Sequence, residues 1–545
     1  MGSSIVTFSN ITFTTIIEIS LAVKFWTGNL ENKWPEYIPT LTGLIIYIFV
    51  ANYAFLALYS EFYRRWLSPL RNLPRAKWSW VYILWRRFVK GSMQGQVFLE
   101  MIQGVPNDGL VAFGDNLLVT KPSALADLLV IHCYDFTKPE GTRKFLRHLI
   151  GEEGVIALEG QPHKILRNIL HPTFSYRRVK DLYPIMWNRS VKLVELVEAE
   201  IQAQNSGGDG HGLAGSIEIS LWTYKIALDI IGFAILGRNL GVLEEKQNQL
   251  INDYEDLWRG TPEKNLYFFL SAWLSFEMVQ LLPWKMNKFF IEKTSSMKRR
   301  CDRLVQQKRE EMKEREHFDI LALLIKSGKL SDRQMSDQLV TSMAAGHDTT
   351  APAISWTCYL LSKHLNWQDA LRKEVSEALN VAGDESNLDA RLEQLPILNA
   401  VISETIRLYP TIPDSPRVAI KDTTIMGQPV PSGTHVLIPI WLVNRSPDVW
   451  GPDAQEFKPE RWIEKGKRNN TGGARSNYDF MTFSHGPRNC IGQFVARAEM
   501  RCVIAALVRR FEWTLDMDDK DVIPSGALTI RPGNGLYLRM KIVEG

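Results

Sequence analysis

The chain has 545 residues, of which 45% are hydrophobic and 23% are charged, which is enough to bury a large core. Its 64 basic and 60 acidic residues leave a net charge of +4, and this balance excludes a strongly basic nucleic-acid-binding protein. The five cysteines are widely spaced without a CxxC pair, which argues against a zinc or redox motif and is typical of a reducing compartment.

An uncharged apolar run near the N-terminus predicts a membrane anchor. Leu41–Leu58 carries no charge over 18 residues, so we predict a transmembrane helix at residues 39–60, with a buried core helix as the alternative. Basic residues follow the run, and the positive-inside rule then places the bulk of the chain in the cytosol. Residues 1–38 contain a second apolar stretch, Ile5–Val23, which spans the membrane, lies at its interface or folds as a short luminal element.

Two later segments also bear on the membrane. Pro69 and Pro74 stiffen a basic segment at residues 61–77, which we predict to be a hinge between the anchor and one large body at residues 78–545. Leu266–Met286 is dense in leucine and aromatic residues. It is equally consistent with a pair of core helices and with a surface patch that dips into a bilayer.

A long helix with an unusual interior is predicted at Ser331–His364, where a capping-box signature begins it. Its middle contains Gly346, Asp348 and Thr349, which are poor residues for a helix interior. Small side chains there leave room for a bound diatomic molecule, the Thr349 hydroxyl can orient a water, and Asp348 can supply protons from outside. The alternative is a helix crossing rich in serine and threonine that has no chemical role.

A charged pair lies inside a strongly apolar helix predicted at Leu395–Leu408. Glu404 and Arg407 are three positions apart, on one helical face. Buried charges are costly unless they are well paired, so the spacing predicts an internal ion pair. Arg461, in a Pro-Glu-Arg-Trp sequence, supplies another arginine downstream.

The most informative stretch is Phe483–Gly492, in which Cys490 stands among small, turn-forming residues. Glycines let this backbone turn sharply, and a helical pattern begins after Gly492, so the helix dipole there favours a thiolate. We predict a loop that presents one thiolate to a large flat partner, with Phe483 shielding the sulfur and Arg488 pairing with a carboxylate of the partner. The alternative is a buried structural cysteine beside a turn.

Together these segments resemble the motifs of the cytochrome P450 family. The cysteine loop is similar to the family's haem-binding loop, and Gly346–Thr350 is similar to its oxygen-activation motif, Gly-x-Asp-Thr-Thr. Glu404 with Arg407, and Arg461, are similar to the ExxR and PER motifs, and all four motifs occur in the family's order and spacing. The resemblance implies a mainly α fold with a small β part, the cytochrome P450 fold, behind an N-terminal transmembrane helix.

The resemblance also implies roles for individual residues. Cys490 is expected to be the axial thiolate ligand of a haem b iron, and Gly346 and Phe483 are expected to lie against the cofactor. Thr349 matches the acid-alcohol residue, with Asp348 as its partner. The three charged residues of the ExxR and PER motifs are expected to form a buried network that holds the cysteine loop and performs no bond chemistry.

The two haem propionates need cationic partners. By resemblance the candidates are Arg488, Arg417 at the start of a predicted strand, and Arg167. His163 stands where the family often has a tryptophan, four positions before Arg167 and on the same helical face, so it is a further candidate. Outside this context, such a pair is usually part of a solvated face.

The resemblance implies a haem-thiolate monooxygenase that hydroxylates or otherwise oxidises a hydrophobic small molecule with O₂, in the manner of fungal secondary-metabolite enzymes. No flavin or dinucleotide motif is visible, so the electrons are expected from a separate NADPH-cytochrome P450 reductase. The expected location is the endoplasmic reticulum membrane, with the catalytic domain facing the cytosol and no nucleic-acid partner.

Several alternatives remain open from the sequence. A P450-type isomerase or dehydratase would keep Cys490 but need no reductase, and dependence on NADPH would separate the two. A lipid-, sterol- or xenobiotic-metabolising P450 would differ in substrate. A haem-based sensor or electron carrier would show little substrate-coupled O₂ consumption, and a membrane scaffold without haem would show no haem absorption.

Overall fold

The computed structural model of the chain describes residues 61–77, 82, 86, 94–205, 214–245, 249–258, 261–273, 276–317, 319–379, 387–526 and 528–543, with scattered positions between 43 and 59. The predicted segment at residues 1–38 lies outside these residues, and the predicted anchor at 39–60 lies only partly within them. The predicted hinge is described throughout, as is most of the predicted body.

Helices dominate the described residues, as predicted from the sequence. The three longest are α9 (Tyr183–Asn205), α14 (Lys285–Glu314) and α16 (Asp332–Lys363). The others are α4 (Gln94–Ile102), α5 (Pro122–Ala126), α6 (Glu140–Ile150), α7 (Gly160–Leu170), α8 (Tyr176–Lys180), α10 (Ile219–Leu236), α11 (Gln249–Trp258), α12 (Pro262–Trp273), α13 (Phe276–Leu281), α15 (Ile320–Ser327), α17 (Leu365–Leu379), α18 (Leu388–Gln394), α19 (Pro396–Leu408), α20 (Ile440–Val443), α21 (Pro447–Trp450) and α22 (Gln493–Arg510).

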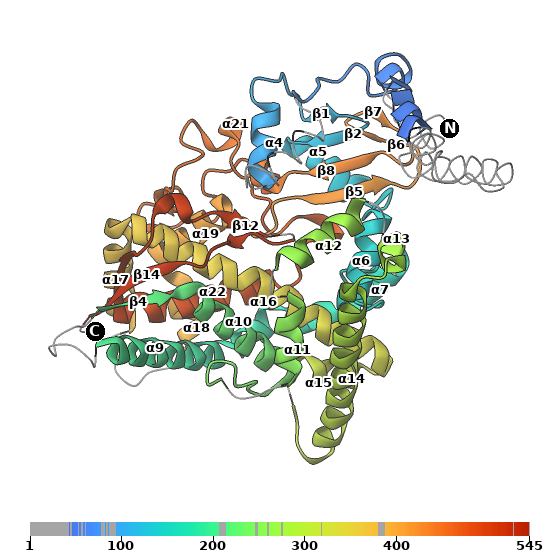
Figure 1. Cartoon of the computed structure of the whole chain (residues 1–545). Helices are drawn as coiled ribbons and strands as arrows, with labels where there is room; N and C mark the ends of the chain where they lie inside the picture. The colour runs from blue at the N-terminus through green and yellow to red at the C-terminus, as the bar shows by residue number, and fades with distance from the viewer. Residues whose placement is uncertain are drawn as a thin grey trace.

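The β part is small and divided. The largest sheet has five strands in the order β1 (Leu110–Phe113), β2 (Asn116–Val119), β8 (His435–Ile438), β5 (Ser415–Ala419) and β3 (Phe136–Thr137). A three-stranded sheet contains β11 (Phe511–Leu515), β14 (Tyr537–Ile542) and β4 (Ala214–Glu218). The two-stranded pairs are β6 (Thr423–Ile425) with β7 (Gln428–Val430), β9 (Ile463–Glu464) with β10 (Lys467–Arg468), and β12 (Pro524–Ser525) with β13 (Arg531–Pro532). In Figure 1 the five-stranded sheet lies above most of the helices.

Helix α16 forms the centre of the helical part, where it packs against α10, α14, α19 and α22 (Figure 1). It begins as predicted, because the Ser331 side chain accepts from the backbone N–H of Gln334 while the Gln334 side chain accepts from the Ser331 N–H. Pro352 lies inside α16 without ending it. Residues in the middle of α16 are therefore held in the core of the protein.

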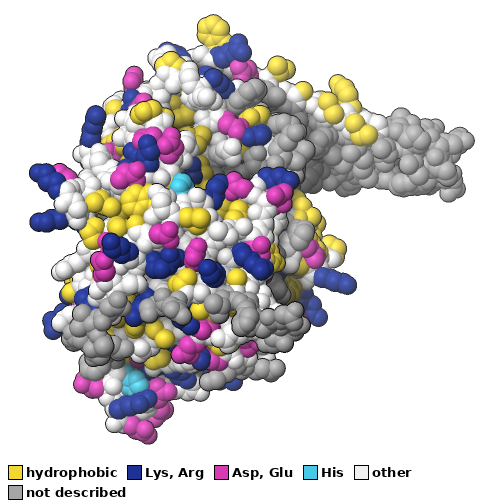
Figure 2. All heavy atoms as spheres, turned by 90° about the vertical axis from the view of Figure 1, so that its left-hand side faces the viewer, with side chains coloured by type: hydrophobic (Ala, Val, Ile, Leu, Met, Phe, Trp, Pro, Cys, Tyr) yellow, Lys and Arg dark blue, Asp and Glu magenta, His cyan; other side chains and the backbone are white. Residues whose placement is uncertain are grey.

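One helix of the described part, α10, is long and apolar enough to cross a membrane by length and composition. It is a core helix, since 67% of its residues are buried and it packs along α16. The described residues of the predicted anchor leave large apolar side chains exposed, with Tyr47 at 70% and Leu58 at 73% of full exposure. On the face of the body shown in Figure 2, basic and acidic side chains are interspersed.

The segment Leu266–Met286 contributes to α12, α13 and the start of α14. Tyr267 and Val279 are buried in the core, whereas Leu266 is exposed and the Leu281 side chain has 85% of full solvent exposure. The segment therefore has apolar side chains on both its buried and its exposed face: the buried ones belong to the core, as in the first alternative, and the exposed ones form the outer surface that the second alternative requires.

Candidate active site

Cys490 lies in the loop that precedes α22, as predicted. Its backbone N–H donates to the Phe483 carbonyl at 2.8 Å, which closes the loop, and Gly486 turns it with φ of +75°. A Cβ at Gly486 would lie 2.2 Å from the Leu129 carbonyl oxygen, so the turn requires glycine. The loop conformation is thus fixed by backbone contacts on the N-terminal side of Cys490.

The Cys490 side chain is exposed, yet the thiol lies deep among protein atoms. The exposed area therefore lies in a recess and not on an open face of the molecule. Burial raises the pKa of the Cys490 thiol, while a hydrogen bond from the Gly492 N–H and the nearby Arg167 guanidinium lower it. Both lowering effects favour the thiolate that a metal ligand must be. The predicted shielding of the sulfur by Phe483 stays a prediction.

A cluster of cations lies beside this loop. Arg488 pairs with Glu159 at 2.7 Å and donates to the Cys133 carbonyl, and Lys138 pairs with the other Glu159 oxygen at 2.8 Å. Arg417 is buried and donates to the Ser415 hydroxyl at 2.9 Å and the Pro416 carbonyl. Burial lowers the pKa of Lys138 to about 8, and burial with the neighbouring Arg488 lowers that of Arg417 to about 10. Two of these cations pair with Glu159 and the third, Arg417, forms no ion pair among the described residues, which leaves an excess of positive charge for an anionic partner.

The sequence missed Lys138 and Glu159. Thr137 on β3 pairs with Val418 on β5, and this register brings Lys138 beside Arg417. Glu159 immediately precedes α7, as its N-cap residue. Pairing between distant strands supplies this contact, so no local pattern of the sequence could have predicted it.

His163 and Arg167 lie on α7 as predicted, but their environments differ. Arg167 donates to the side chain of Asn489, the residue before Cys490. His163 is buried, its Nδ1 has no hydrogen-bond partner among the described residues, and burial lowers its pKa to about 4. The imidazole is therefore neutral and lacks the charge expected of a propionate partner. It can still donate one hydrogen bond, so its assignment to the cofactor stays a prediction.

Thr349 and Asp348 lie in the middle of α16. The Thr349 hydroxyl donates to the Ala345 carbonyl at 2.7 Å, and one Asp348 oxygen accepts from the Thr529 hydroxyl at 2.7 Å. Burial raises the pKa of Asp348 to about 6, although Thr529 and Arg531 oppose the shift. A carboxyl with this pKa can take up and release a proton near neutral pH. The sequence missed Thr529 and Arg531, which follow the loop at 525–528.

Gly346 has a packing role in the structure. A Cβ there would lie 2.5 Å from the side chain of Ile231 on α10, so the glycine allows α10 and α16 to approach closely. This close packing explains why a glycine occupies position 346. The assignment of Gly346 to cofactor binding stays a prediction. The adjacent His347, which had no predicted role, is buried with its Nδ1 3.0 Å from the Tyr254 hydroxyl.

Glu404 and Arg407 form a fully buried bidentate ion pair on α19, with N–O distances of 2.7 and 2.8 Å and no exposed side-chain area. Arg407 also donates to the carbonyls of Asn444 and Ala454, and Glu404 accepts from the Trp462 indole at 2.9 Å. These contacts satisfy the charges that burial would otherwise penalise.

The network extends toward the cysteine loop. Arg461 approaches Glu404 at 3.5 Å. The Asn444 side chain donates to the Thr482 hydroxyl and accepts from the Met481 N–H, each at 2.8 Å. Thr482 directly precedes Phe483, so a continuous set of hydrogen bonds joins the ion pair to the loop of Cys490.

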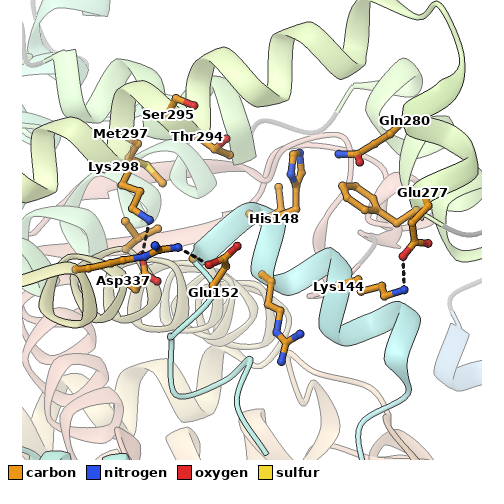
Figure 3. A pocket seen from close by; sticks show the side chains of 16 residues that line it. Lys144, His148, Glu152, Glu277, Gln280, Thr294, Ser295, Met297, Lys298 and Asp337 are labelled. Carbon is orange, nitrogen blue, oxygen red and sulfur yellow. Dashed lines mark hydrogen bonds and ion pairs between the residues drawn. The ribbon is translucent and has the colours of Figure 1, made fainter. Parts of the chain in front are cut away.

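A hollow of about 450 Å³ lies between α6, α13, α14 and α16, and its lining contains none of these site residues (Figure 3). Three ion pairs join its walls: Lys144 with Glu277, Arg333 with Glu152, and Lys298 with Asp337 at 3.7 Å. Most of the charged side chains that line this hollow are paired with one another across its walls. We therefore do not assign it to the site around Cys490.

Comparison with known proteins gives a consistent family. The model of the family described as "Cytochrome P450" matches residues 114–538. The "Cytochrome P450 monooxygenase sphH" of Aspergillus fumigatus is 37% identical over 459 residues, covering 82% of this chain and 83% of that protein. The "Cytochrome P450 monooxygenase ptmK" of Penicillium ochrochloron is 36% identical and covers 87% and 94%. The "Cytochrome P450 monooxygenase abl5" of Leptosphaeria maculans is 30% identical and covers 99% of both chains.

Proposed function

This chain belongs to the cytochrome P450 family, and from that premise we propose that Cys490 would supply the thiolate ligand of a haem b, which would provide the chemistry for oxidising a hydrophobic small molecule. The enzyme is a monooxygenase of fungal secondary-metabolite type. The observation that carries the proposal is the accessible thiol of Cys490, held in a closed loop beside an excess of buried cations.

The residues present fit a haem. Arg488 and Arg417, together with Lys138, would hold its carboxylates, and the Arg488 Nε and His163 Nδ1 are buried without partners among the described residues. A bound haem with a thiolate ligand supplies the activation of O₂. The chain provides the anionic sulfur, the Gly492 N–H and Arg167 that stabilise it, and the cations that orient the group.

Asp348 and Thr349 are proposed to move protons into the site. Asp348 accepts a hydrogen bond from Thr529 and has a pKa of about 6, so it can take up and release a proton near neutral pH. Thr349 can release the Ala345 carbonyl and hold a water in its place, because its hydroxyl is both a donor and an acceptor. A P450-type isomerase would not need this pair.

Thr349→Ala tests this assignment. We expect haem content to be unchanged while the ratio of product to NADPH consumed falls by about tenfold and peroxide increases, because proton delivery loses its hydroxyl. Thr357→Ala is a matched control, since Thr357 on the same helix makes the same bond to the carbonyl four residues earlier, at 2.8 Å. Equal coupling in wild type and Thr349→Ala would contradict the role of Thr349.

The monooxygenase needs a redox partner, and we propose an NADPH-cytochrome P450 reductase on the same membrane. Exposed cations at Lys465, Lys467 and Arg475 lie in the segment that follows Arg461 and would attract an acidic partner. The apolar outer face of α12 and α13, with the exposed side chains at residues 47 and 58, supports attachment to the endoplasmic reticulum membrane.

The proposed orientation predicts which sequons carry sugar. Asn188, in Asn-Arg-Ser, is exposed, and we expect it to stay unglycosylated because the body faces the cytosol. With a single span, Asn10, in Asn-Ile-Thr, would instead be luminal and accept a glycan. Asn444 carries no information, since its amide is buried and bonded to Thr482. Glycosidase-sensitive mass on Asn188 in microsomes would reverse the orientation.

The experiment that tests the function is product formation by the full-length enzyme with its reductase. The substrate is found by comparing metabolites of cells with and without the gene, and we expect a product with one added oxygen atom per NADPH consumed. Turnover of that substrate without NADPH would favour the isomerase or dehydratase.

A further inference from the structure

A second hollow of about 310 Å³ opens on the surface among α8, α18, α19, β10 and α22. Three arginines line it: Arg468 from β10, and Arg497 and Arg501 one turn apart on α22. One carboxylate, that of Glu393 on α18, is part of the same wall. The lining therefore has a formal charge of +2, from three cations and one anion.

The carboxylate is already engaged by other groups. Glu393 accepts from the hydroxyls of Tyr176 and Tyr183, and its nearest arginine nitrogen, on Arg501, is 3.5 Å away. Arg468 donates to the backbone carbonyl of Glu393 at 3.2 Å. Arg497 donates to the Ser403 hydroxyl at 3.2 Å. Within the described residues, neither Arg468 nor Arg497 forms an ion pair.

The arginines repel one another where they are partly buried. Burial, Arg501 and Arg468 lower the pKa of Arg497 to about 9, and burial followed by Arg501 lowers that of Arg468. Like charges brought together away from water are costly unless an opposite charge is present. In the folded protein this repulsion between arginines is not neutralised by an ion pair to Arg468 or Arg497 among the described residues, and the hollow is open to solvent.

We propose that this hollow binds the dianion of a phosphate group, either inorganic phosphate or a small phosphate monoester. Guanidinium groups match phosphate oxygens with paired hydrogen bonds, and a dianion neutralises the excess of two positive charges. The Ser403 hydroxyl and the Asn470 amide add donors on the same wall.

The rim of the hollow also suits a ring attached to the phosphate. Phe494 and Tyr176 lie edge to face with ring centres 5.9 Å apart, and both are 42% exposed. The site is separate from the cysteine loop but close to it, because Arg497 also lies 5.2 Å from the ring centre of Phe483. This binding goes beyond the proposed oxidation and does not depend on the haem assignments.

The test measures thermal unfolding of the full-length, haem-loaded protein in detergent, with phosphate against chloride at equal ionic strength. We expect the midpoint to rise with phosphate and to saturate, because a ligand of the folded state stabilises it. Arg468→Gln should weaken the apparent affinity by about tenfold or more, as loss of a charged hydrogen bond does. Arg475 is exposed in the same segment but lies outside the hollow, so Arg475→Gln should leave the apparent affinity for phosphate unchanged. A wild-type response that is absent, or identical in Arg468→Gln, overturns the proposal.

A gain-of-charge variant keeps the test valid if Arg468→Gln fails to fold. Ser403→Asp places a carboxylate next to Arg497, so it should raise the midpoint in phosphate-free buffer and abolish the response to phosphate. A Ser403→Asp variant that still responds fully contradicts the site. Adenosine monophosphate identifies the source: tighter binding than inorganic phosphate indicates an organic monoester, and equal or weaker binding indicates free phosphate.

Discussion

Arg407→Gln is expected to lower the free energy of unfolding by about 3–5 kcal/mol, because it leaves the Glu404 carboxylate buried without its partner. Both side chains have no exposed area, so water cannot replace the lost contact. The backbone carbonyls of Asn444 and Ala454 would lose a charged donor at the same time. Chemical denaturation of the purified protein measures the change.

Two variants separate this effect from a general loss of charge. Lys192→Gln removes a cation from an exposed pair with Glu195 at the same spacing, on α9, and such pairs contribute only about 0–1 kcal/mol. Glu404→Leu with Arg407→Leu removes both buried charges, and we expect it to cost much less than the sum of the two single changes. If Arg407→Gln is no more destabilising than Lys192→Gln, the ion pair does not hold the fold.

Arg407→Gln should also reduce the amount of haem-loaded protein. Asn444 connects the ion pair to Met481 and Thr482, which lead into the loop of Cys490. When Arg407 no longer holds the Asn444 carbonyl, the loop loses one of its supports. A variant that unfolds more easily but loads haem as well as wild type would show that the loop is held independently.

The elements that the sequence predicted best have local signals. The start of α16 follows from the capping box at Ser331, and the position of Cys490 before α22 follows from glycines succeeded by a helical pattern. The pairing of Glu404 with Arg407 could be predicted because opposite charges on one face of an apolar helix are costly to bury unless they neutralise each other.

What the sequence did not predict depends on contacts between distant segments. Thr529 reaches Asp348 across 181 residues, and Lys138 meets Arg417 through strand pairing. The neutral state of His163 depends on burial that no pattern in α7 reveals. Gly346 faces Ile231 because α10 packs closely against α16, which is a matter of tertiary packing.

Loss of the thiolate is the second large effect that we expect. Cys490→Ser replaces the sulfur with a hydroxyl that stays protonated at neutral pH, so the haem iron would lose its anionic ligand. Product formation should fall to background. Cys502→Ser is the matched control, since Cys502 is buried on α22 and lies outside the loop.

The carbon monoxide difference spectrum of the reduced protein tests the central claim most directly. Wild type and Cys502→Ser are expected to show the absorption band of a thiolate-ligated haem, and Cys490→Ser is expected to lack it. A Cys490→Ser protein that binds haem and keeps an unchanged band would contradict the assignment of Cys490 as the iron ligand.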